Sequence, residues 1–129
     1  MIIQIQKFEK NAIALELFET FTEADALLIE HLFEEKLNQG YEHVNILIQV
    51  KDMSVLKHMD LKGFIEGELW GIRHINKLGR CAVVSHSDIM ASIIKVENKV
   101  LHFFNDALEE KYFDHSQLDE ALKFITPEA

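Results

Sequence analysis

Residues 80–86 read RCAVVSH, a short apolar run rich in β-branched side chains. A run of this kind is typical of a central strand in a parallel sheet. Residues 43–50, HVNILIQV, predict another strand. A helix-length segment separates these two strands, and another follows residues 80–86. This pattern favours parallel strands joined by helical crossovers.

The rest of the chain predicts further strands. Residues 2–8 and 11–19 predict an opening hairpin, and Gln4 and Gln6 suit an edge strand that is exposed on one side. Residues 109–113, EEKYF, predict a short last strand. The sheet is therefore expected to have five strands.

Four segments predict helices. The first begins at Thr22, a residue type that favours the N-cap, and ends at Gly40. The last has Ser116 and Asp119 spaced as a near capping box. The order β-β-α-β-α-β-α-β-α predicts an α/β protein, one domain over residues 1–129 with a mostly parallel sheet. The predicted helices span residues 22–40, 60–78, 88–104 and 116–125.

Composition narrows the classes of partner. The chain has 129 residues and a formal net charge of −9, which argues against nucleic acid and against electrostatic docking on anionic lipid. The single cysteine, Cys81, excludes an internal disulfide and is expected to be a buried strand residue rather than a reactive thiol. The sequence shows no secretory leader and no membrane-spanning run, so we expect a cytoplasmic protein.

The order and spacing of these elements resemble the STAS fold of bacterial anti-anti-sigma factors, and more closely the SpoIIAA-like family of small bacterial proteins. The resemblance runs nearly end to end, through the hairpin, GYEHVNILIQV (40–50), WGIRHINKLGRCAVVSHSD (70–88) and EEKYFDHSQLDEALKFI (109–125). It implies a fold related to STAS domains and to the CRAL-TRIO lipid-transfer fold. It also implies a small binding module for an apolar ligand rather than an enzyme.

The resemblance also bears on regulation. Anti-anti-sigma factors carry a phosphorylated serine in a pattern such as MDSSGL, whereas residues 59–64 of this chain read MDLKGF. Met59, Asp60 and Gly63 match, but Leu61 and Lys62 replace the two serines. Neither side chain can accept a phosphoryl group, so the phosphoserine switch is predicted to be absent.

The predicted helix 60–78 contains three glycines spaced four residues apart, although each costs roughly 0.5–1 kcal/mol relative to alanine. They form a smooth stripe beside the core-facing side, flanked by Trp70 and His74. Such a stripe lets another backbone or a flat apolar ligand approach closely. Tight packing against the neighbouring helix and ligand contact both remain open.

The predicted helix 88–104 has an apolar arc of about half its circumference, wider than one sheet contact requires. Glu97 falls inside this arc, so its carboxylate must reach the rim, pair with a base, or lie at the mouth of an apolar pocket. We predict that such a pocket lies between helices 60–78 and 88–104. The predicted ligand-binding residues are Gly63, Gly67, Trp70, Gly71, His74, Ile94, Glu97, Leu101 and Phe104.

Ligands of open parallel sheets bind beyond the carboxyl ends of the strands. The histidines and aspartates expected at this edge could ligate a metal. The sequence there has no HxH or HExxH pair and no cysteine ligand. Ser85, His86 and Asp88 are neighbours in sequence, yet a catalytic triad is made in space. We therefore predict no catalytic residue, metal or cofactor. The residues at this edge are Asp52, His58, Asp60, His86, Asp88, Asp114 and His115.

Three functional hypotheses follow. The first is a non-catalytic module that binds an apolar or lipid-like ligand between helices 60–78 and 88–104, with peripheral contact to a membrane surface. The second is a STAS-type interaction module that forms a homodimer or binds a regulatory partner without the phosphoserine switch. The third is a metal-dependent enzyme at the strand carboxyl ends. The resemblance favours the first.

Overall fold

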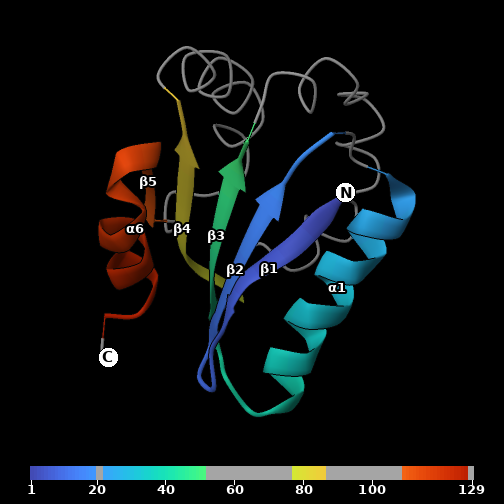
Figure 1. Ribbon diagram of the computed structural model, residues 1–129. Helices are drawn as coiled ribbons and strands as arrows, with labels where there is room; N and C mark the ends of the chain where they lie inside the picture. Colours follow the sequence, from blue (N-terminus) through green and yellow to red (C-terminus); the bar gives the residue numbers. More distant parts are fainter. Residues whose placement is uncertain (20–21, 52–76, 87–108, 128–129) are drawn as a thin grey trace.

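The described residues form one mixed sheet whose strands pair in chain order, β1-β2-β3-β4-β5 (Figure 1). The computed structural model describes residues 1–19, 22–51, 77–86 and 109–127. β1 pairs antiparallel with β2, and the three pairings from β2 to β5 are parallel. The strands are β1 (Ile2–Lys7), β2 (Ala12–Leu17), β3 (Val44–Val50), β4 (Leu78–Ser85) and β5 (Glu109–Asp114).

The strand predictions agree with this sheet, with small shifts at the ends. The predicted hairpin is β1-β2, and β1 is an edge strand as its alternation indicated. Leu78, predicted as the last residue of a helix, instead begins β4 because it pairs with Val44. The rest of predicted helix 60–78 and the whole of 88–104 lie outside the described residues, so those helices remain predictions.

Helix α1 (Glu23–Asn38) begins and ends where the sequence predicted. Thr22 and Asp25 form a capping box: the Asp25 N–H donates to Thr22 Oγ1 at 3.3 Å, and the Thr22 N–H donates to Asp25 Oδ2 at 2.8 Å. The Met1 ammonium lies 2.9 Å from the same carboxylate oxygen. Burial disfavours the charged form, but the hydrogen bonds from Met1 and Thr22 outweigh it and lower the pKa of Asp25 below its usual 3.8. Beyond the helix, Gly40 has a φ of +99°, which favours glycine.

Helix α6 (Leu118–Ile125) starts two residues later than predicted. The expected capping pair of Ser116 and Asp119 is wrong, because both the main-chain N–H and the hydroxyl of Ser116 donate to Asp114. Asp114 caps a short 3₁₀ turn, η3 (His115–Gln117), that precedes α6. No helix of the described ranges has the length and apolarity needed to cross a membrane.

The two faces of the sheet have different packing. On the face that α1 covers, the strands bring together large aliphatic side chains around the buried Phe33. On the α6 face, small side chains let the helix approach, and α6 packs mainly against β4. The small residues there are Ala12, Ala14 and Ala82.

The pairing of β3 with β4 is interrupted by a β-bulge opposite Asn45. The register shifts here, so Gly79 and Arg80 together oppose one residue of β3. The buried Asn45 side chain fills the break: its Oδ1 accepts from the Arg80 N–H at 2.8 Å, and its Nδ2 donates to the Ile125 carbonyl at 2.9 Å. A Cβ on Gly79 would collide with Asn45 Oδ1. This amide therefore ties β3, β4 and the end of α6 together.

Candidate functional site

The candidate edge residues that fall within the described ranges lie at the carboxyl ends of β4 and β5. His86 follows β4, Asp114 ends β5, and His115 begins η3. The rings of His86 and His115 are in contact, with centroids 3.9 Å apart and planes tilted by 41°. Three of the seven predicted edge residues are thus brought together. The other four lie outside the described residues: Asp52, His58, Asp60 and Asp88.

Asp114 has a capping role at this edge. Its Oδ2 accepts from the Ser116 N–H at 3.0 Å and from the Ser116 hydroxyl at 2.6 Å. His115 Nδ1 lies 3.4 Å from the same oxygen. The Ser116 hydroxyl and N–H, with a smaller contribution from His115, lower the pKa of Asp114 below its usual 3.8. An exposed carboxylate held in its charged form is suited to orient a neighbour rather than to act as a general acid near neutral pH.

Ser85 is the last residue of β4 and is almost completely buried. Its hydroxyl donates to the carbonyl of His86 at 3.2 Å, so this hydrogen bond goes to the main chain rather than to the imidazole that follows. Among the described residues, no three side chains of histidine, cysteine, aspartate or glutamate are grouped so that they could hold a metal ion.

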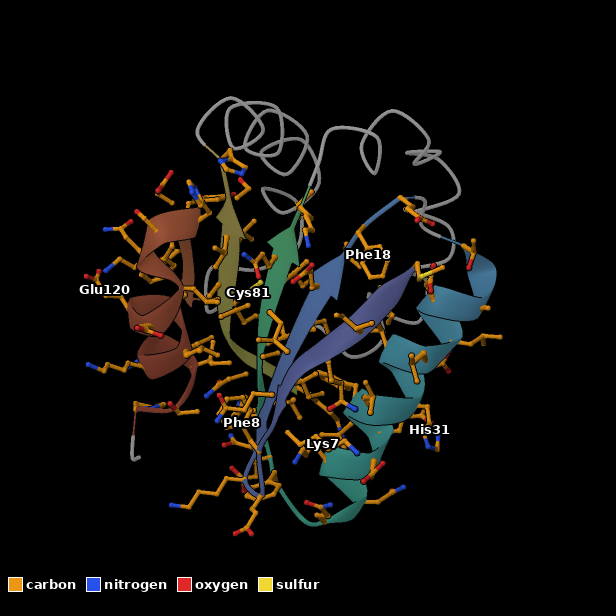
Figure 2. The ribbon with its side chains drawn as sticks, in the orientation of Figure 1. Lys7, Phe8, Phe18, His31, Cys81 and Glu120 are labelled. Carbon is orange, nitrogen blue, oxygen red and sulfur yellow. The ribbon has the colours of Figure 1, made fainter. Side chains whose placement is uncertain are left out.

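The predicted ligand-binding residues cannot be placed against this edge, because they all lie outside the described residues. They are Gly63, Gly67, Trp70, Gly71, His74, Ile94, Glu97, Leu101 and Phe104. Cys81, the remaining prediction on β4, is in a strand as expected but is half-buried rather than fully buried (Figure 2).

A cleft that was not predicted from the sequence lies at the opposite end of the sheet, beside the β1-β2 turn. Its volume is about 520 Å³, within the usual range of small-molecule sites. Lys7 and Phe8 lie at this end of the sheet in Figure 2. The lining comes from the hairpin turn, the start of β3 and the end of α6: Lys7, Phe8, Glu9, Lys10, Asn11, Ala12, Tyr41, Asn45, Thr126 and Pro127.

This cleft lies at the amino ends of β2 and β3 and is called the amino-end cleft below. Hydrogen bonds between residues far apart in sequence hold its segments together. Lys36 of α1 donates through Nζ to the Phe8 carbonyl at 2.6 Å, and Asn11 Nδ2 donates to the His43 carbonyl at 2.8 Å. The partners are about thirty residues apart in sequence, so local pattern does not reveal them. The lining combines the aromatic side chains of Phe8 and Tyr41 with the charged residues Lys7, Glu9 and Lys10.

Comparison with known families decides the relationship of this chain. A family model described as SpoIIAA-like matches residues 12–126. The chain belongs to the SpoIIAA-like family. Comparison with curated proteins and with solved structures gave no match.

The SpoIIAA-like match agrees with the resemblance inferred from element order. The matched region begins at Ala12, the first residue of β2, and ends at Thr126, directly after α6. It therefore includes every parallel strand and both described helices, while β1 precedes it. The mixed five-stranded sheet is consistent with a STAS-like α/β module.

Proposed function

We propose that this SpoIIAA-like protein is a non-catalytic binding module for an apolar or lipid-like ligand. The ligand would lie between the segments 60–78 and 88–104, and the module would contact a membrane surface only peripherally, from the cytoplasm. The observation that carries the proposal is the strand order of the sheet.

The strand order predicts which face of the sheet the segments 60–78 and 88–104 cover. β2, β3, β4 and β5 follow one another across the sheet in parallel, and α1 makes the first crossover. Crossovers between parallel strands are right-handed in nearly all proteins. Successive right-handed crossovers in one direction across a sheet fall on the same face. We therefore expect 60–78 and 88–104 on the α1 face, next to each other.

The sheet supplies an apolar floor for such a site. Cys81 and Val83 of β4 and Tyr112 of β5 belong to the cluster on the α1 face, beside the buried Phe33. Cys81 and Tyr112 are half-buried. The sequence pattern adds the predicted glycine stripe with Trp70 and the wide apolar arc predicted for 88–104, which we expect to lie over this floor.

Native mass spectrometry of the protein as purified from cells tests the proposal. We expect a co-purifying mass of several hundred daltons that is lost on denaturation. The proposal is wrong if the purified protein carries no such mass and also takes up none from a lipid extract.

Variants locate the site. Gly67→Leu and Trp70→Ala should abolish or weaken ligand retention while the fold survives, as judged by circular dichroism. Tyr41→Ala, in the amino-end cleft, is the matched aromatic control and should retain the ligand. Loss of ligand in Tyr41→Ala alone would move the site to that cleft.

A second function, interaction with a protein partner, is favoured by one observation. Large hydrophobic side chains are exposed around the N-terminus and the first turns of α1: Met1, Ile3, Leu27 and Leu28. Leu27 and Leu28 are neighbours on α1, and exposed apolar side chains that lie together are typical of an interaction surface. If the native protein is a ligand-free dimer that Leu28→Ser converts to a monomer, the interaction module is the better description.

A further inference from the structure

The contact between His86 and His115 is independent of the proposed ligand site. The two imidazoles come from the ends of adjacent parallel strands, which brings their rings to a centroid distance of 3.9 Å. Both residues are exposed, and the side chain of His115 is 49% accessible. Ions in solution can therefore reach both rings.

One of the two rings is already oriented. His115 Nδ1 faces Asp114 Oδ2 at 3.4 Å, and the Ser116 N–H and hydroxyl fix that carboxylate. Histidines that bind metals usually donate one ring N–H to a carboxylate or carbonyl, which leaves the other nitrogen as the ligand. This arrangement leaves Nε2 of His115 as the nitrogen that can act as a metal ligand.

We propose that His86 and His115 together bind one late first-row divalent cation, of which Zn²⁺ is the probe to use. Imidazole nitrogen is a preferred ligand of Zn²⁺, Ni²⁺ and Cu²⁺ but not of Mg²⁺. Asp114 acts as a positioning residue for His115, and water completes the coordination. With two protein ligands, the site is exchangeable and not a structural zinc centre, which has four.

Isothermal titration of the untagged full chain with Zn²⁺ tests this proposal, with Mg²⁺ as the control ion. We expect one Zn²⁺ per chain, and affinity about tenfold or more weaker in His86→Ala and in His115→Ala. The double variant should bind no more weakly than either single variant, because each one already breaks the chelate. Asp114→Asn keeps an acceptor for Ser116 and should weaken binding less.

The matched control is His31→Ala. His31 is exposed on α1 (Figure 2) and lies 4.0 Å from Glu35, so it is a second place where Zn²⁺ could bind without a histidine pair. Its removal should leave the affinity unchanged. If His31→Ala weakens binding as much as His86→Ala does, or if the wild type and the double variant bind alike, the proposal is wrong.

Nuclear magnetic resonance gives a readout that does not depend on affinity alone. One equivalent of Zn²⁺ should shift the ring signals of His86 and His115 together, before those of the other histidines. Shifts that begin at other histidines would overturn the assignment. Melting curves recorded without metal should be the same for the wild type and the histidine variants, since both rings are on the surface.

Discussion

Replacing Asn45 by alanine tests how β3, β4 and α6 are joined. Asn45 is 7% exposed, and its side chain serves two main-chain groups, the Arg80 N–H and the Ile125 carbonyl. Alanine removes both hydrogen bonds at once. A buried polar group that loses its partner costs about 1–3 kcal/mol, so the loss of two such partners in Asn45→Ala should lower the free energy of unfolding by about 2–6 kcal/mol.

Urea denaturation followed by circular dichroism measures this loss. With a slope of about 2 kcal/mol per molar urea, the midpoint should fall by about 1–3 M. Gln49→Ala is the matched control, because Gln49 is an amide on the same face of β3 but is only half-buried. Its effect should stay within about 0.5 kcal/mol.

Gly79 provides an independent check through a double-mutant cycle. In the wild type, the Cβ of Gly79→Ala collides with Asn45 Oδ1 and should cost about 1–3 kcal/mol. In the Asn45→Ala background that oxygen is gone, so Gly79→Ala should cost at least about 1 kcal/mol less. Strict additivity of the two substitutions, or a loss below about 1 kcal/mol for Asn45→Ala, would refute this account of the bulge.

Three further substitutions test the helices and the core. Phe33→Ala should destabilise the protein by about 3–5 kcal/mol in the same urea assay, because Phe33 is 1% exposed at the centre of the α1 face. Gly40→Ala should cost about 1–2 kcal/mol from backbone strain alone, since φ is +99° and nothing lies within 4 Å of the added Cβ; Gly40→Asn should cost less. Asp25→Asn should destabilise more at pH 7 than at pH 2: a lowered native pKa gives stability that is present above the usual pKa of 3.8 and is lost as the pH falls through the native value. An equal loss at both pH values would show that the charge of Asp25 is not the cause.

The elements that could be predicted from sequence are those whose hydrogen bonds are local. Thr22 and Asp25 are three residues apart, and Gly40 follows directly at the end of α1, so the bounds of that helix are written in a short stretch. The alternation of β1 and the apolar runs of β3 and β4 likewise predict strands from neighbouring residues. The same local reading failed at α6, where Asp114 lies closer to Ser116 than the expected partner Asp119 and captures both of its donors.

The tertiary structure decided everything that joins distant residues. Asn45 and Ile125 are eighty positions apart, and only the packing of α6 on the sheet makes one amide serve both strands and helix. The amino-end cleft is assembled from three separate segments for the same reason. For the candidate site, strand order predicted that His86, Asp114 and His115 share an edge, but the ring contact depends on the register of β4 against β5. Sequence fixes the period of an element, whereas the distance between side chains of two elements is set by register and packing, which no single segment contains.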